Sequence, residues 1–186
     1  VLGQWLLDQP LPQDEMPKAR EGGLNALERL RWKKCPHTAQ VEALIQRHPS
    51  WMNSTTARLL ANQHLEQLFK AKTMADGQRL WEQVVALVKT HAVPLSPGDE
   101  DHAFKHPFLK NLLKLATQHA KQPKHLKATI AKIEWALQNG ATIEDHHRGT
   151  PVWYLGLKNN APWAAMAPLF ERGLDPRQPP QFSFPE

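Results

Sequence analysis

Helical periodicity constrains this chain more strongly than any other feature of its sequence. Apolar residues recur at spacings of three and four, which places their side chains on one face of an α-helix. No alternating β-branched run of strand length is present, and glycine, proline and asparagine interrupt the pattern at short intervals. The pattern predicts helices over residues 23–33, 38–47, 55–71, 76–90, 108–119, 123–138, 151–158 and 162–172. We therefore expect an all-α fold in which successive helices form antiparallel pairs.

The two ends of the chain differ from the region between them. The 186 residues suffice for one domain with a buried core. Residues 1–19 contain three prolines, and residues 177–186 contain three more. Because a proline lacks an N–H donor and has a fixed φ angle, both ends are expected to be extended. The sequence thus predicts an N-terminal arm over 1–19, a helical domain over 20–176 and a proline-rich tail over 177–186.

Cysteine content and hydropathy bear on where the protein works. Its one cysteine, Cys35, excludes an internal disulfide and suits a reducing compartment. No stretch approaches the ~18 consecutive apolar residues that a membrane-spanning helix needs. The first ten residues lack the basic and apolar regions of a signal peptide. We expect a soluble monomer in the cytoplasm, or one that is delivered into another cell's cytoplasm.

A single basic segment carries the positive charge of the chain. The net charge is +5, and seven lysines but no acidic residue lie within residues 102–133, whereas the rest of the chain has more acids than bases. Two pairs of these lysines have the spacing of neighbours on a helix face, Lys110 with Lys114 and Lys124 with Lys127. They either form the solvated outer face of the helices or bind a polyanion such as nucleic acid, with an affinity that falls steeply with salt.

The second helix of each predicted pair ends in the same apolar pattern. Apolar residues precede the helix terminator by seven, four and three positions, which places them on one stripe of the helix. The four sets are Val41, Leu44 and Ile45 before His48; Val84, Leu87 and Val88 before His91; Ile133, Ala136 and Leu137 before Gly140; and Met166, Leu169 and Phe170 before Gly173. Any amphipathic helix with a defined end can produce such offsets, so the pattern alone leaves open whether the pairs are repeats.

More specific motifs occur late in the chain. Gly140-Ala141 ends one helix, Arg148-Gly149-Thr150-Pro151 precedes the next, and the segment 169–176 ends with Gly173-Leu174-Asp175-Pro176. Over residues 133–176 the chain resembles the ankyrin repeat, whose pattern runs G-x-T-P-L-H-x-A and then V-x-x-L-L-x-x-G-A-D. It departs from that pattern at Leu155-Gly156, where the family has small paired alanines. The resemblance implies a short α-solenoid of about four antiparallel helix pairs.

Local chemistry predicts how these helices begin and end. Pro151 is expected in the first turn, where its missing N–H costs no hydrogen bond, and the Thr150 hydroxyl should cap exposed amide groups. Gly140 and Gly173 are expected in the left-handed conformation that ends a helix. Asp175 should start the turn to the tail.

A binding role follows from the resemblance, because ankyrin-like stacks present a concave groove and projecting turns. The resemblance implies another protein as the partner, with contacts from Arg148, Trp153 and Tyr154. Trp5, Trp153 and Trp163 are the tryptophans best placed to be exposed. Trp153 stands where the family has histidine, on the first helix of its pair, and either anchors a partner or fills core volume.

Signatures of catalysis and of metal binding are few. His102 and His106 lie at helical spacing beside three carboxylates, which suits a metal ion, but Pro107 disfavours a helix there, and a solvated loop is the alternative. Cys35 lies among cations, yet no nucleophile motif, phosphate-binding loop or H-E-x-x-H motif is present. We expect no enzyme, no cofactor and no metal. The alternatives to a protein-binding module are a nucleic-acid or polyanion-binding protein and a bacterial effector or immunity-type protein.

Overall fold

The structure, a computed structural model, describes residues 54–96, 107–147, 149–175, 177 and 180. Several predictions fall outside the described residues. They concern the N-terminal arm, the helices over 23–33 and 38–47 and the apolar residues Val41, Leu44 and Ile45. They also concern Trp5, Cys35, the motif around His102 and His106, Arg148 and most of the tail.

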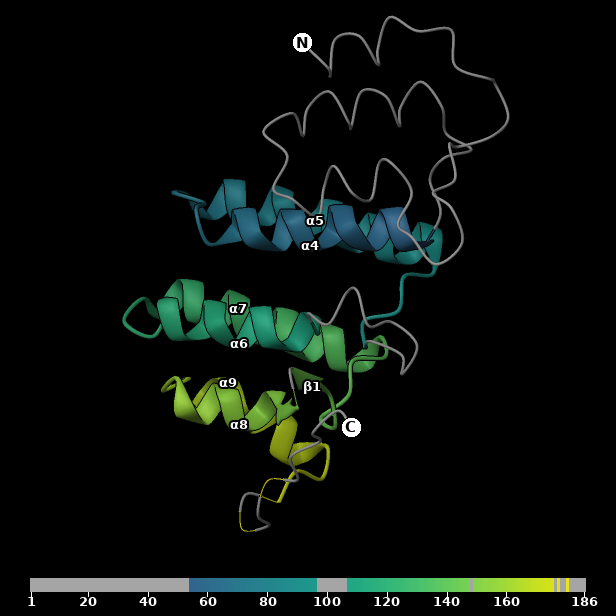
Figure 1. Cartoon of the computed structure of the whole chain (residues 1–186). Helices are drawn as coiled ribbons and strands as arrows, with labels where there is room; N and C mark the ends of the chain where they lie inside the picture. Colours follow the sequence, from purple (N-terminus) through teal and green to yellow (C-terminus); the bar gives the residue numbers. More distant parts are fainter. Residues whose placement is uncertain (1–53, 97–106, 148, 176, 178–179, 181–186) are drawn as a thin grey trace, which may run out of the picture. The chain divides into compact units, whose positions relative to one another are not determined.

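Six helices and one short hairpin make up the described part of the chain (Figure 1). In order, they are α4 (Ser54–Leu68), α5 (Met74–His91), α6 (Phe108–Gln118), α7 (Pro123–Gln138), β1 (His146–His147), β2 (Thr150–Pro151), α8 (Val152–Lys158) and α9 (Trp163–Glu171). The prediction of a helical fold is confirmed for these residues, and each helix ends within three residues of its predicted bounds. The hairpin was not predicted. It pairs His146 with Pro151 and His147 with Thr150 in antiparallel register.

The chain divides into two compact units, and helices α4 and α5 contribute to both. The described part of the first unit is residues 54–61 and 86–93. Its described residues bury Ala57, Leu60, Val88 and Val93. The described part of the second unit is residues 62–85, 94–96, 107–147, 149–175, 177 and 180, and it contains all the candidate site residues that the structure describes.

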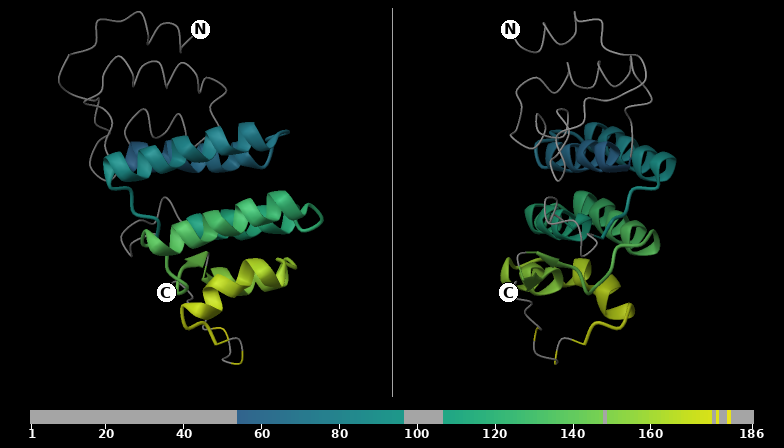
Figure 2. Two further views of the ribbon diagram at one scale, coloured as in Figure 1. Left: turned by 180° about the vertical axis from the view of Figure 1, so that it is seen from behind. Right: turned by 45° about the vertical axis from the view of Figure 1, so that its right-hand side comes forward.

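Two helical hairpins form the centre of the second unit. Helix α6 packs against α7 and α8, and α7 packs against α9, so that the α6–α7 pair lies over the α8–α9 pair (Figure 2). The fully buried side chains of this core include Phe108, Leu109, Leu112, Leu113, Ile133, Met166 and Leu169. The apolar stripe predicted for α7 therefore faces the core, as do Met166 and Leu169 of the stripe predicted for α9, whereas Phe170 is half-buried. None of the described helices is long and apolar enough to cross a membrane.

Four described helices end with the same backbone geometry. A residue with positive φ follows each helix, and the next N–H donates to a carbonyl five residues earlier, which satisfies an otherwise unpaired carbonyl. The positive-φ residues are Ala92 (46°), Gly140 (102°), Asn160 (56°) and Gly173 (95°). The bonds join Val93 to Val88, Ala141 to Ala136, Ala161 to Gly156 and Leu174 to Leu169 over 2.9–3.2 Å. The prediction for Gly140 and Gly173 is confirmed, but Ala92, not His91, is their counterpart after α5.

The start of α8 differs from the prediction. Thr150 pairs with His147 in the hairpin, and no side chain caps the helix. Pro151 is the N-cap residue itself, one position earlier than expected, with φ −55° and ψ 134°. The free N–H of Val152 instead donates to the carbonyl of Asp145 over 2.8 Å. The turn at Asp175 is as predicted, because its Oδ1 accepts the N–H of Arg177 over 3.0 Å.

Candidate functional site

The tryptophan predicted to anchor a partner is buried. Trp153 is 8% exposed, and its ring meets that of Tyr154 edge-on at a centroid distance of 5.9 Å. The expectation that Trp153 is exposed is wrong, because α8 is covered by both α6 and α9. Of its two interpretations, the structure favours core filling. Tyr154 is half-buried, and Arg148 lies outside the described residues, so their partner-binding role stays a prediction.

Trp163 is exposed, as predicted. The side chain is 66% exposed at the start of α9, and its ring stacks on Phe170 with centroids 4.7 Å apart. The two rings line a shallow hollow together with Leu174 and Arg177. Arg177 is held by Asp175 through a bond of 3.0 Å from Nε to Oδ1.

Of the four lysines predicted to bind a polyanion, three are exposed in one region and the fourth lies apart from them. Lys114, Lys124 and Lys127 are exposed near the turn between α6 and α7. Lys110 is half-buried near the start of α6, and its Nζ lies 2.8 Å from Nε2 of His147 in the hairpin. The prediction that Lys110 acts with the other three is therefore not supported, because its ammonium is engaged by the hairpin.

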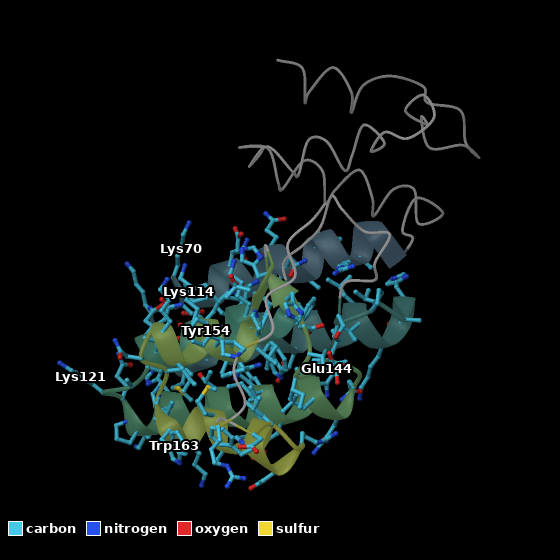
Figure 3. The ribbon with its side chains drawn as sticks, turned by 60° about the horizontal axis from the view of Figure 1, so that its bottom comes forward. Lys70, Lys114, Lys121, Glu144, Tyr154 and Trp163 are labelled. Atoms are coloured by element: carbon cyan, nitrogen blue, oxygen red, sulfur yellow. The ribbon has the colours of Figure 1, made fainter. Side chains whose placement is uncertain are left out.

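Two helix–helix turns bring additional lysines to this site. Lys70 and Lys72 are exposed in the turn between α4 and α5, and Lys121 is exposed in the turn between α6 and α7. The turns are joined at Phe69, whose carbonyl accepts from Gln118 over 3.0 Å and whose ring lies 5.1 Å from Nζ of Lys114. Figure 3 shows Lys70, Lys114 and Lys121 on one side of the unit, away from Glu144.

We call this surface the lysine edge, and it consists of Lys70, Lys72, Lys114, Lys121, Lys124 and Lys127. Within the described residues, none of the six forms an ion pair with a carboxylate. The carboxylate of Asp76, at the start of α5, is instead engaged by the Thr73 hydroxyl at 2.8 Å and by Arg79 at 3.8 Å. Lysines without carboxylate partners create a positive potential that attracts anions over about a Debye length, or ~8 Å at physiological salt.

A small pocket lies between the α4–α5 turn, α6 and α7, and three basic side chains contribute to its wall. The imidazoles of His119 and His125 have centroids 5.1 Å apart, and Lys132 is only 8% exposed. Burial lowers the pKa of His119, and the positive charges of His125 and Lys132 lower it further. Burial likewise lowers the pKa of Lys132. In the sequence, this cluster is indicated by the four histidines that lie among the lysines of residues 102–133, two of which line the pocket.

The lowered pKa of His119 makes stability depend on pH. Between the usual histidine pKa of about 6.5 and its lower value in the fold, the unfolded chain binds a proton that the folded chain does not. The free energy of unfolding should therefore fall as the pH is lowered through this window, and it should level off below it. Urea denaturation at a series of pH values should show a smaller fall for His119→Gln than for the wild type. Equal pH dependence in both proteins would contradict this assignment.

The described residues offer no cluster of three or more histidine, cysteine or carboxylate groups arranged to hold a metal ion. Comparison with known proteins found no family model, no curated protein and no solved structure that matches this chain. The function of the lysine edge and of the pocket is therefore inferred from their charge and geometry.

Proposed function

We propose that this protein is a non-catalytic binding module that recognises an acidic protein through its lysine edge. The observation that carries the proposal is the set of six exposed lysines in and beside the α4–α5 and α6–α7 turns, none of which has a carboxylate partner among the described residues. Long-range attraction by such a surface raises the rate of encounter with an acidic partner. Exposed lysines contribute little to the stability of a fold. Fold stability therefore does not account for the lysine edge, whereas binding of an acidic partner does.

We further propose that the helix pairs form a short, ankyrin-like α-solenoid. The geometry shared by the ends of α5, α7 and α9, the second helix of each pair, supports this, because a repeated supersecondary unit ends in the same way each time. In such an array, every helix–helix turn lies at the same margin, and lysines in successive turns line up along it. The lysine edge is the part of that margin formed by the α4–α5 and α6–α7 turns.

Two features favour a protein partner over nucleic acid, the second candidate. Proteins that bind single strands add aromatic rings on which bases stack, yet Phe69, beside the edge, lies under the ammonium of Lys114. The rings of Trp81 and Trp135 pack edge-on against each other at 5.2 Å. The edge also consists of lysines alone, whereas base-specific readout commonly uses arginine, asparagine or glutamine. The lysines themselves would still bind phosphates, so nucleic acid belongs in the test.

Charge reversal at the edge tests the proposal. The variant Lys114→Glu/Lys121→Glu/Lys124→Glu should bind fluorescent poly-glutamate at least about tenfold more weakly than the wild type in anisotropy titrations, because each reversal replaces attraction by repulsion. A matched control, Lys89→Glu/Arg172→Glu/Arg177→Glu, has the same net charge and reverses exposed residues near the ends of α5 and α9, away from the α4–α5 and α6–α7 turns. The control should retain most of the affinity.

Two outcomes would overturn the proposal. If the control variant loses as much affinity as the edge variant, binding reflects net charge and not this surface. If duplex DNA or single-stranded RNA binds the wild type more tightly than poly-glutamate does at equal salt, the nucleic-acid function takes its place. The salt dependence of binding provides a further check. A protein that makes six or more phosphate contacts loses a factor of ~10³ or more in affinity between about 50 and 200 mM salt.

A further inference from the structure

The pocket beside the lysine edge contains a hydrogen-bond arrangement that fixes the tautomer of His119. The Thr129 hydroxyl donates to the carbonyl of His125 over 2.9 Å, which uses its only proton. Nδ1 of His119 lies 2.9 Å from the same hydroxyl oxygen, so Nδ1 carries a proton and donates it. Nε2 is therefore the nitrogen that gains a proton on acidification and becomes a second donor.

Lys132 places a poorly neutralised cation in the same pocket. Its Nζ donates to the carbonyl of Ala128 over 3.2 Å and lies 5.6 Å from the ring centroid of Trp81. These contacts use one of the three N–H donors of the ammonium group. The pocket lining includes no carboxylate, and the residues that α4 and α5 contribute to it are uncharged. Burying a cation without an anion is costly, and an anion in the pocket would offset that cost.

We propose that this pocket is a binding site for a single phosphate group, held by Lys132 and the protonated imidazole of His119, with His125 as a further donor. A phosphate carries several strong acceptor oxygens, and it can therefore accept from donors that line one pocket from the end of α6, at His119, and from α7, at His125 and Lys132. The site goes beyond the proposed function, because its donors are partly buried and none belongs to the lysine edge. The edge would raise the local concentration of the anion.

Acidification is expected to strengthen binding. The groups that face His119 are His125 and Lys132 of α7, both of which oppose its protonation, and a bound dianion would favour that protonation. Phosphate itself gains a proton near neutral pH, so sulfate, which stays doubly charged, is the probe for this effect. Sulfate affinity should increase at least about fivefold when the pH is lowered from ~8 to ~5.5, where imidazoles become charged.

The experiment titrates the full chain with inorganic phosphate at constant ionic strength and follows the histidine ring resonances by NMR. We expect saturable shifts of the His119 resonances. Lys132→Met should weaken phosphate binding at least about tenfold, since a charge-assisted bond is lost, while Lys158→Met, at an exposed lysine outside the pocket, should leave it unchanged. O-phosphoserine in place of inorganic phosphate distinguishes a phosphorylated side chain of a partner from the free anion.

Linear, non-saturating shifts of the wild-type resonances, or equal affinity in Lys132→Met and Lys158→Met, would overturn the phosphate site. The wild-type titration decides the matter even if Lys132→Met fails to fold. Neither result depends on the poly-glutamate experiment, so the phosphate site can fail while the lysine edge retains its function. Conversely, the edge variant Lys114→Glu/Lys121→Glu/Lys124→Glu retains all three donors and should still bind phosphate saturably.

Discussion

Trp153→Ala is expected to lower the free energy of unfolding by about 3–5 kcal/mol, the cost of removing a large buried aromatic side chain. Trp153 is 8% exposed on α8, a helix of seven residues that packs against both α6 and α9. A helix this short depends on tertiary packing and not on its own propensity. Urea denaturation followed by far-UV circular dichroism measures the effect, which should appear as a lower midpoint.

Trp163→Ala is the matched control for that measurement. This residue has the same side chain, but it is 66% exposed at the start of α9, and its loss should cost less than about 1 kcal/mol. An unchanged urea midpoint for Trp153→Ala would show that Trp153 is not part of the core. Its interpretation as a partner-binding anchor would then return.

The bounds of the helices could be predicted because local residues set them. Helix α7 begins at Pro123 and ends at Gln138, as predicted, since proline suits a first turn and Asn139-Gly140 provides the end of the helix. The hairpin at His146–Pro151 was not predicted, because a two-residue strand has no periodicity of its own. The hairpin is defined only by the pairing of His146 with Pro151 and of His147 with Thr150, around Gly149 with a φ of 76°.

The burial of Trp153 could not be predicted, because periodicity says which residues share a face but not which faces other helices cover. Gly156 shows the same limit. A Cβ atom at this position would lie 3.0 Å from Cδ1 of Leu113 and 3.2 Å from Sδ of Met166. The glycine thus permits a close approach of α6, α8 and α9 at this point, which no local feature of the sequence indicates.

The lysine edge was predicted in part. Counting charge along the chain found Lys114, Lys124 and Lys127, which are close in sequence. It could not find Lys70 and Lys72, because the contact that brings their turn to α6 joins residues 49 apart, Phe69 and Gln118. It also included Lys110, whose Nζ is engaged by His147, a residue of the hairpin that was not predicted.

Asp145 is a structural residue that the sequence did not single out. Asp145→Ala should lower the free energy of unfolding by about 2–4 kcal/mol, because a hydrogen bond to a buried charged group is worth about 1.5–3 kcal/mol and the longer of its two bonds adds less. The side chain is 6% exposed. Its carboxylate accepts from the Thr142 hydroxyl at 3.3 Å and from the Ser96 hydroxyl at 3.0 Å, whose single proton is shared with the carbonyl of Gly140 at 3.2 Å. It thus joins the segment after α5 to the turn after α7.

The backbone bond from Val152 to the carbonyl of Asp145 persists in the variant, so the start of α8 is retained and the measured loss belongs to the carboxylate. Asp145→Asn keeps one carbonyl acceptor and should lose about half as much, in line with bonds to a neutral group of about 1 kcal/mol each. Glu144→Ala, next to it but exposed, should change stability by less than about 0.5 kcal/mol. If Asp145→Ala unfolds at the same urea concentration as Glu144→Ala, the carboxylate does not hold the two segments together. A graded loss from Glu144→Ala through Asp145→Asn to Asp145→Ala would show that it does.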